Sequence, residues 1–152
     1  MHDSSSIDPP QHPGTPLLGT WRLRSFEMRD EDGNIAYPFG NETGGFITYT
    51  SDGRMSVQFG NSHRAELRDG DWLGATTEEI ERSARSYFAY CGTYEIRGNE
   101  VIHRIEWSLM PNWIGGEQRR LWQLDGGTLT ITTPPLLLEG RPQTSTLVWE
   151  RV

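Results

Sequence analysis

The sequence predicts an all-β protein, an up-and-down antiparallel barrel of about eight strands with one short helix. Three observations support this prediction. Most of the chain consists of short runs in which apolar residues alternate with polar ones, short turns rich in Gly, Asp and Asn separate the runs, and 17 glycines accompany an aromatic content of 11%. Consecutive antiparallel strands in this number favour a closed barrel, because closure removes exposed strand edges.

Length and charge limit the classes of protein that fit. A chain of 152 residues is enough for one domain, and its net charge of -7 disfavours a nucleic-acid partner. Cys91 is the only cysteine, which excludes an intramolecular disulfide and argues against a structural zinc site. No run approaches the roughly 18 apolar residues of a membrane span, and the N-terminus lacks the regions of a secretion signal. We therefore expect a cytoplasmic protein that does not contact a membrane. A homodimer is compatible with the sequence.

The chain begins with a tail and a first strand. Residues 1–16 are rich in Ser, Pro and His and carry almost no apolar residues, so we expect a disordered tail and a barrel domain over residues 17–152. From Leu17 the residues alternate between two faces: Trp21, Leu23 and Ser25 on one, and Arg22, Arg24 and Phe26 on the other. Trp21 is expected to close the base of the barrel. A short extended piece over residues 35–39 follows a polar turn.

A hairpin and a helix come next. Residues 44–50 and 54–59 are β-rich runs joined by the turn at residues 51–53. The hairpin has apolar faces made of Ile47 and Tyr49 on one strand and Met55, Val57 and Phe59 on the other. After an aperiodic segment, Thr76 and the acids behind it predict a helix start, and the spacing of Ile80, Ala84 and Tyr87 predicts a helix that ends near Tyr87.

The second half of the chain holds the remaining strands. Alternation assigns each of the next three runs one inward face: Phe88, Tyr90, Gly92, Tyr94 and Ile96, then Val101, His103, Ile105, Trp107 and Leu109, then Gln118, Arg120, Trp122 and Leu124. A longer loop around Pro111 separates the second run from the third. Residues 128–133 and 144–151 predict the last two long strands, with an apolar piece at 136–138 between them.

Several short motifs, in this order, resemble the bacterial and fungal lipocalin-like domain family. They are Gly19-Thr20-Trp21, Tyr37-Pro38-Phe39-Gly40, Tyr49-Thr50 with Asp52-Gly53-Arg54-Met55-Ser56, Tyr90-x-Gly92-x-Tyr94, His103, Pro111-Asn112-Trp113 and Leu147-Val148-Trp149-Glu150-Arg151. The similarity runs from about Leu17 to the C-terminus. It implies a calycin-type barrel around a small-molecule cavity, and it fixes no reaction, because such proteins include binders and members of natural-product pathways.

His103 is the only histidine inside a predicted strand. On an inward face, an imidazole could donate or accept a proton in an otherwise apolar cavity. The alternative is a histidine that is hydrogen-bonded for structural reasons alone.

Arg120 shares its expected inward face with Trp122. A buried guanidinium needs a partner, so it either pairs with Glu106 or a tyrosine, or holds an anionic or carbonyl group of a ligand. Of these, a structural ion pair is the first expectation. Arg119 takes this place if the register slips by one residue.

Aromatic residues supply the other candidates. Tyr49, Tyr90 and Tyr94 could orient a ligand oxygen, although most rings at alternating positions are simply core. The remaining expected ligand contacts are Phe88, Met55, Trp107, Trp113 and Trp122. No phosphate-binding loop, catalytic serine motif, carboxylate pair or metal-spaced cluster occurs, so we expect neither metal nor cofactor.

Two functions fit these expectations. The first is a cofactor-independent cyclase or isomerase acting on an apolar natural-product metabolite, with His103 as acid or base and Tyr90, Arg120 or both polarising an oxygen. The second is a carrier or sequestering protein for the same kind of ligand without turnover. The sequence does not separate them.

Overall fold

The computed structural model describes residues 15–152, and the predicted tail therefore lies almost entirely outside the described residues. The elements in chain order are β1 (Gly19–Asp30), β2 (Ile35–Ala36), β3 (Thr43–Tyr49), β4 (Arg54–Asn61), α1 (Thr77–Arg85), β5 (Tyr87–Arg97), β6 (Glu100–Ser108), the 3-10 turn η1 (Pro111–Trp113), β7 (Glu117–Asp125), β8 (Thr128–Thr132), β9 (Leu136–Leu138) and β10 (Arg141–Arg151).

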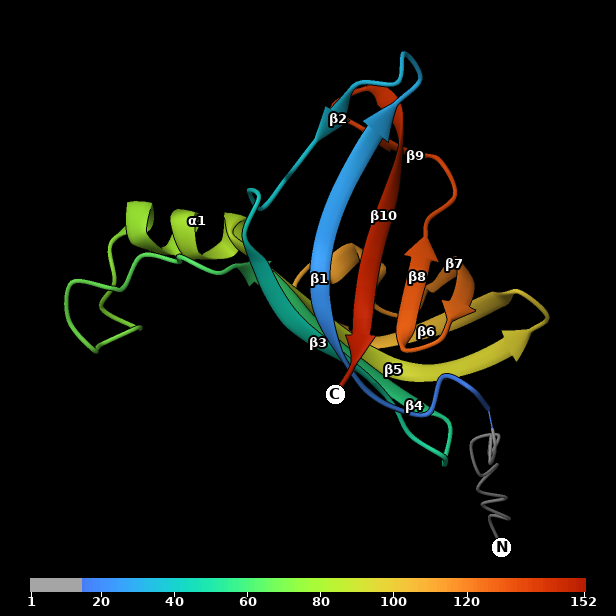
Figure 1. Cartoon of the computed structure of the whole chain (residues 1–152). Helices are drawn as coiled ribbons and strands as arrows, with labels where there is room; N and C mark the ends of the chain where they lie inside the picture. Colours follow the sequence, from blue (N-terminus) through green and yellow to red (C-terminus); the bar gives the residue numbers. More distant parts are fainter. Residues whose placement is uncertain (1–14) are drawn as a thin grey trace, which may run out of the picture.

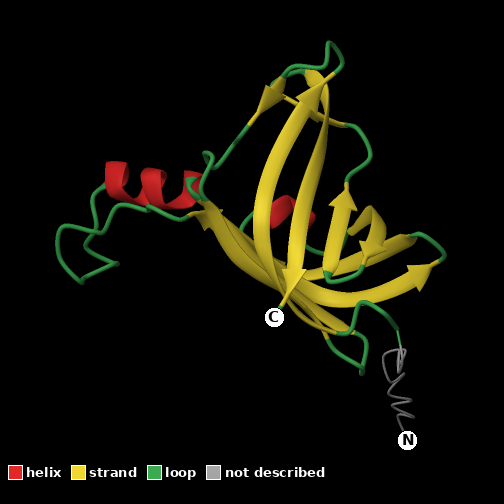
Figure 2. Ribbon diagram, viewed as in Figure 1, coloured by secondary structure: helices red, strands yellow, loops and turns green. Residues whose placement is uncertain are grey.

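The eight longer strands form a closed antiparallel barrel (Figure 1). Successive strands pair in the order β1-β3-β4-β5-β6-β7-β8-β10, and the pairing of β1 with β10 closes the sheet. The two short strands extend its margin, β2 beside β1 and β9 beside β10. Strands dominate the molecule and a single α-helix lies within the described range (Figure 2). The all-β barrel fold predicted from the sequence is confirmed.

One end of the barrel is filled by its own core. Trp21 is completely buried, and its indole Nε1 donates a 3.0 Å hydrogen bond to the carbonyl of Leu17. The guanidinium of Arg151 lies 4.1 Å from the centre of the Trp21 ring and donates to the carbonyls of Leu18 and Pro16. As expected, Trp21 closes this end, and space for a ligand remains only toward the other.

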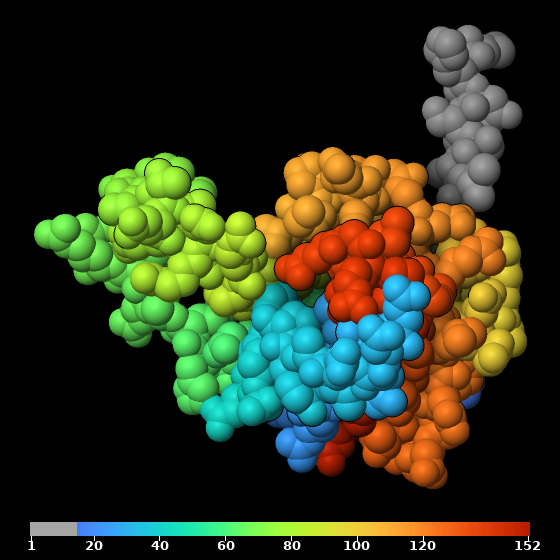
Figure 3. All heavy atoms as spheres, turned by 90° about the horizontal axis from the view of Figure 1, so that it is seen from above, coloured from blue at the N-terminus to red at the C-terminus, as the bar shows by residue number. Residues whose placement is uncertain are grey.

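The opposite end is formed by the segments that carry β2 and β9. Seen from above, these segments lie side by side over the end of the barrel (Figure 3). They contribute Pro38, Phe39, Leu136 and Leu138 to the wall of an internal cavity. This end is therefore the mouth of the barrel.

The short helix lies where the sequence signals place it. Thr76 caps α1 in a reciprocal capping box with Glu79. The helix ends at Arg85, two residues before the expected end near Tyr87, and Tyr87 is the first residue of β5. No residue of α1 is buried, and the helix lies beside the barrel (Figure 1).

Two β-bulges alter the faces that strict alternation assigns. In β1 the register against β10 shifts between Leu23 and Ser25, so Phe26 is buried on the same side as Leu23, and its expected place on the face of Arg22 and Arg24 is wrong. Between β5 and β6 the register shifts at Gly92, which pairs with Ile105, while Cys91 pairs with Trp107.

The second bulge turns Trp107 outward. Its side chain is 72% exposed, so the expected inward placement of Trp107 is wrong. Gly92 permits the close approach of the two strands, because a Cβ built there would lie 1.8 Å from the carbonyl oxygen of Arg104.

Candidate functional site

An internal cavity of about 230 Å³ occupies the barrel between its filled end and its mouth. Most of its wall is apolar, and phenylalanine and tryptophan rings contribute to it. They are Phe26, Phe39, Phe59, Phe88, Trp113 and Trp149. Phe59 contacts four of the other five rings, those of Phe26, Phe39, Phe88 and Trp149, at centroid distances of 5.4 to 6.3 Å. The packed rings provide a rigid, flat-sided space that suits a small apolar ligand.

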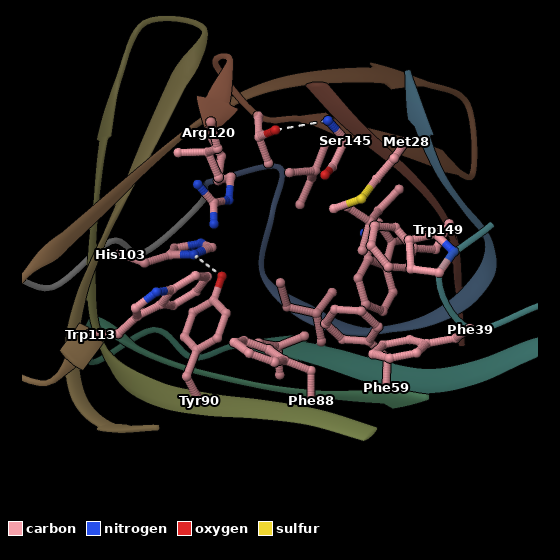
Figure 4. Close-up of a pocket in the computed structure, with 18 of the residues that line it drawn as sticks. Met28, Phe39, Phe59, Phe88, Tyr90, His103, Trp113, Arg120, Ser145 and Trp149 are labelled. Carbon is pink, nitrogen blue, oxygen red and sulfur yellow. Dashed lines mark hydrogen bonds between the residues drawn. The ribbon is translucent and has the colours of Figure 1, made fainter. Parts of the chain in front are cut away.

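Polar groups gather on one side of this cavity, where Tyr90, His103 and Arg120 converge (Figure 4). The Tyr90 hydroxyl lies 2.8 Å from Nδ1 of His103, and the Tyr49 hydroxyl lies 2.8 Å from Nε2 of the same ring. His103 is 1% exposed. Both nitrogens of a buried imidazole are thus bonded to phenols from β3 and β5.

Burial controls the protonation of this group. Desolvation, helped by the positive charge of Arg120, lowers the pKa of His103 to about 3. The imidazole is therefore neutral near pH 7, and a neutral ring has one N–H and one lone pair. It follows that one phenol donates to the ring and the other accepts from it. Burial also raises the pKa of Tyr49 and of Tyr90, and Arg120 acts in the opposite direction on both, so both phenols stay protonated.

Arg120 is a buried cation on the cavity wall. It is 7% exposed, and its Nη1 donates to the side-chain oxygen of Gln118 at 3.2 Å and to the carbonyl of Arg119 at 3.0 Å. Its guanidinium carbon lies 6.0 Å from the centre of the Trp113 ring. Among residues 15–152 no carboxylate lies within ion-pair distance of Arg120.

The expected structural ion pair of Arg120 is therefore wrong. Glu106 lies on the outer surface and pairs with Arg54. Arg119 is half exposed and faces Glu100 and Glu117 across the outer surface, so no slip of register exchanges the two arginines. With no carboxylate near it, the Arg120 guanidinium keeps the capacity to hydrogen-bond an oxygen inside the cavity.

The ten residues expected at the site fall into three groups. Five line the cavity: Phe88, Tyr90, His103, Trp113 and Arg120. Four do not: Tyr49 lies behind His103, Tyr94 donates to the carbonyl of Thr50, Met55 is buried in the core, and Trp122 packs against the core from its margin. Trp107 is on the surface, and the ligand contact inside the barrel expected of it is wrong.

Sequence reasoning missed much of the wall. Phe26 was placed on the face of Arg22 and Arg24, and Met28, Ser145 and Trp149 were given no role at the site, although all four line the cavity. The alternation of β10 from Ser145 through Leu147 to Trp149 was a usable signal, because those three residues share one face. No comparable signal marks Phe26, because its direction depends on the bulge.

The described residues contain no group of three or more His, Cys, Asp or Glu side chains placed to hold a metal ion. Within the same residues, no helix has the length and apolar content needed to cross a membrane. The polar side chains in the lining of the apolar cavity are those of Tyr90, His103, Arg120, Thr133 and Ser145, so the chemistry that it offers is hydrogen bonding.

The fold and this cavity define an antiparallel β-barrel with an apolar internal cavity, and comparison with known proteins gives its family. Residues 18–152 match the lipocalin-like domain family, and the chain belongs to it. It is 32% identical over 107 residues to the 4'-hydroxy-3'-methoxypropiophenone carrier protein ppsC of Aspergillus oryzae, an alignment that covers 64% of this chain and 96% of that protein.

A solved structure, of an uncharacterized protein from Bacteroides eggerthii, aligns over 90% of this chain and 99% of its own. The TM-score is 0.43 and the sequence identity 13%.

Proposed function

We propose that this protein binds and carries a small aromatic compound that presents an oxygen acceptor to Arg120 and Tyr90. The observation that carries the proposal is the buried guanidinium of Arg120, which has no carboxylate partner among the described residues and lines an apolar cavity. Desolvating a cation without a counter-charge is unfavourable, and a ligand oxygen offsets that cost.

The size and lining of the cavity narrow the ligand. Its volume of about 230 Å³ is below the roughly 300–1,000 Å³ typical of pockets for drug-sized ligands. One aromatic ring with small substituents fits such a space, and packed side chains such as Phe88 and Trp113 offer faces for it to stack on.

The relative in Aspergillus oryzae supports the same class. Its name specifies a carrier of 4'-hydroxy-3'-methoxypropiophenone. Such a compound is a single benzene ring with a ketone, a hydroxyl and a methoxy group. An aryl ketone of this kind has the carbonyl oxygen that Arg120 and Tyr90 need and the flat apolar body that the rings of the wall need.

The environment of His103 favours carriage over catalysis. A general acid or base works best with a pKa near the working pH and with a nitrogen free to reach the substrate. The pKa of His103 is lowered to about 3, and phenols occupy both of its ring nitrogens. The imidazole therefore orients Tyr90 within the cavity wall.

Calorimetric titration with 4'-hydroxy-3'-methoxypropiophenone, followed by long incubation and chromatography of the extracted compound, tests the proposal. We expect saturable binding with one site per chain and recovery of the compound unchanged. Lack of binding by this compound and by simpler propiophenones would contradict a carrier of aryl ketones, and conversion to an isomer would replace carriage by catalysis.

One observation favours a second candidate, a cofactor-independent cyclase or isomerase. Tyr90 contacts His103, and the charge of Arg120 acts on its phenol. A phenol held in this way can polarise a ligand carbonyl, and the enclosure excludes water. If turnover exists, Tyr90→Phe should reduce it by about 10²- to 10⁴-fold while binding persists. A variant with undiminished turnover would remove Tyr90 from the chemistry.

A further inference from the structure

We propose that Ser145 and Thr133 form a second polar position in the cavity, which selects aryl ketones that carry a ring hydroxyl. This inference rests on the proposed function and assigns a binding position to a second polar group of the ligand. It assigns the ketone to Arg120 and Tyr90, and the ring hydroxyl to the two hydroxyl side chains on the adjoining wall.

The hydrogen bonds of Ser145 indicate an available hydroxyl. The residue is 5% exposed and lines the cavity. Its backbone N–H donates to Oγ1 of Thr133 at 2.9 Å, and its carbonyl accepts from the backbone N–H of Thr133 at 2.9 Å. Within residues 15–152 the Ser145 Oγ has no hydrogen-bond partner. Because Ser145 lines the cavity, a ligand there can supply the partner of this hydroxyl.

Thr133 reaches this position because β8 ends there. In a regular antiparallel pair, the N–H of Ser145 would bond to the Thr133 carbonyl. Pro134 and Pro135 follow Thr133 and direct the chain away, so the Thr133 hydroxyl accepts the bond instead. That leaves the hydroxyl proton of Thr133 as a second donor on a wall that both residues line.

The strand register places this pair near Arg120. Leu121 pairs with Thr132 between β7 and β8, so Arg120 and Thr133 occupy the next level of the ladder. Ser145 is one strand further and pairs with Met28 of β1 on its other side. Two strand spacings separate Arg120 from Ser145, about 9–10 Å between backbones. Figure 4 shows Ser145 on the wall between Arg120 and Trp149.

The hydrogen-bonding capacity of the protein side chains decides which ligand group lies at Arg120 and which lies at Ser145 and Thr133. A guanidinium only donates, so the group at Arg120 must be an acceptor such as a ketone oxygen. Serine and threonine hydroxyls both donate and accept, so they can satisfy a phenol, which also does both. A ring with a ketone and a hydroxyl on opposite sides has the required arrangement.

The test measures four dissociation constants by calorimetry, for propiophenone and 4'-hydroxypropiophenone with the wild type and with Ser145→Ala. We expect the variant to weaken 4'-hydroxypropiophenone by about 2- to 12-fold, the loss of one neutral hydrogen bond, and to leave propiophenone unchanged. Ser56→Ala, on the exposed face of β4, is the matched control and should change neither.

Equal effects of Ser145→Ala on both ketones would overturn the second polar position while leaving the carrier intact. Binding of neither ketone to the wild type would overturn both proposals. Because the Ser145 hydroxyl bonds to no described residue, the variant should unfold at the wild-type temperature. If Ser145→Ala does not fold, the variants Thr133→Ser and Thr133→Val allow the same comparison. Only Thr133→Val should lose the preference for 4'-hydroxypropiophenone over propiophenone. If Thr133→Val kept the preference for 4'-hydroxypropiophenone, that result would contradict the inference.

Discussion

The hydroxyl oxygen of Tyr90 lies 2.8 Å from Nδ1 of His103, inside a barrel where the imidazole is 1% exposed. Since Tyr49 occupies the other ring nitrogen, the imidazole ring is fixed from both sides. The direction of the Tyr90 phenol therefore depends on a neutral His103. Protonation would remove the lone pair that one of the two phenols needs.

The first prediction concerns the dependence of stability on pH. In the unfolded chain His103 has the ordinary pKa of about 6.5, and in the folded protein its pKa is lowered to about 3. Between these values the unfolded state binds the proton, so stability is full above about pH 6.5 and falls as the pH decreases toward 3. Urea unfolding should give a free energy about 2 kcal/mol lower at about pH 5 than at about pH 7.5 from this group alone.

His103→Gln should lose this dependence, because an amide does not titrate. His63→Gln is the matched control, since His63 is exposed on the surface, and it should keep the wild-type slope. Glu95, whose pKa is lowered to about 2 by Arg97 and Arg104, contributes only below its ordinary pKa of 4.5, outside this pH range. Parallel pH profiles for the wild type and His103→Gln would show that the imidazole is not held neutral.

A second prediction compares two tryptophans. Trp107 is 72% exposed and Trp149 is 1% exposed on the cavity wall. Trp107→Ala should change the free energy of unfolding by no more than about 0.5 kcal/mol and leave ligand affinity intact. Trp149→Ala should destabilise the protein by about 3–5 kcal/mol. Similar losses in the two variants, measured by urea unfolding, would be incompatible with the bulge opposite Gly92.

The strands and their order could be predicted from alternation and turn residues, and so could the helix start at Thr76. The bulges could not be predicted, because no residue pattern in either strand marks the position at which two residues oppose one. One bulge turned the side chain of Trp107 to the outer surface, and the other moved Phe26 from the face of Arg22 and Arg24 to the face of Leu23. The alternation of apolar and polar residues therefore predicts which side chains share a face only up to the next β-bulge in the strand.

The candidate site, too, could be predicted only in part from the sequence. His103, Tyr90 and Arg120 could be found because polar residues on an apolar face stand out in the sequence. The hydrogen bonds to both nitrogens of His103 could not, because Tyr49 and His103 are 54 positions apart and meet only through closure of the barrel. The contribution of the segment that carries β9 was also hidden, since it depends on how Leu136 and Leu138 lie over the mouth.

A third prediction uses that segment. In β9 the side chain of Leu138 lines the cavity, whereas its neighbour Leu137 is 74% exposed. Leu138→Ala should weaken binding of propiophenone, because the ligand loses an apolar contact at the mouth. Leu137→Ala is the matched control and should have the wild-type dissociation constant. If Leu137→Ala has the larger effect, the ligand does not lie under β9.

Titration of Arg120→Met with propiophenone tests the central claim most directly, because methionine keeps an apolar chain of similar length and removes the charge. A hydrogen bond to a charged group contributes about 1.5–3 kcal/mol, so the dissociation constant should rise by about 13- to 160-fold. The free energy of unfolding should stay level or increase, since a buried cation without a carboxylate partner is removed. An unchanged dissociation constant in a folded Arg120→Met protein would contradict the account.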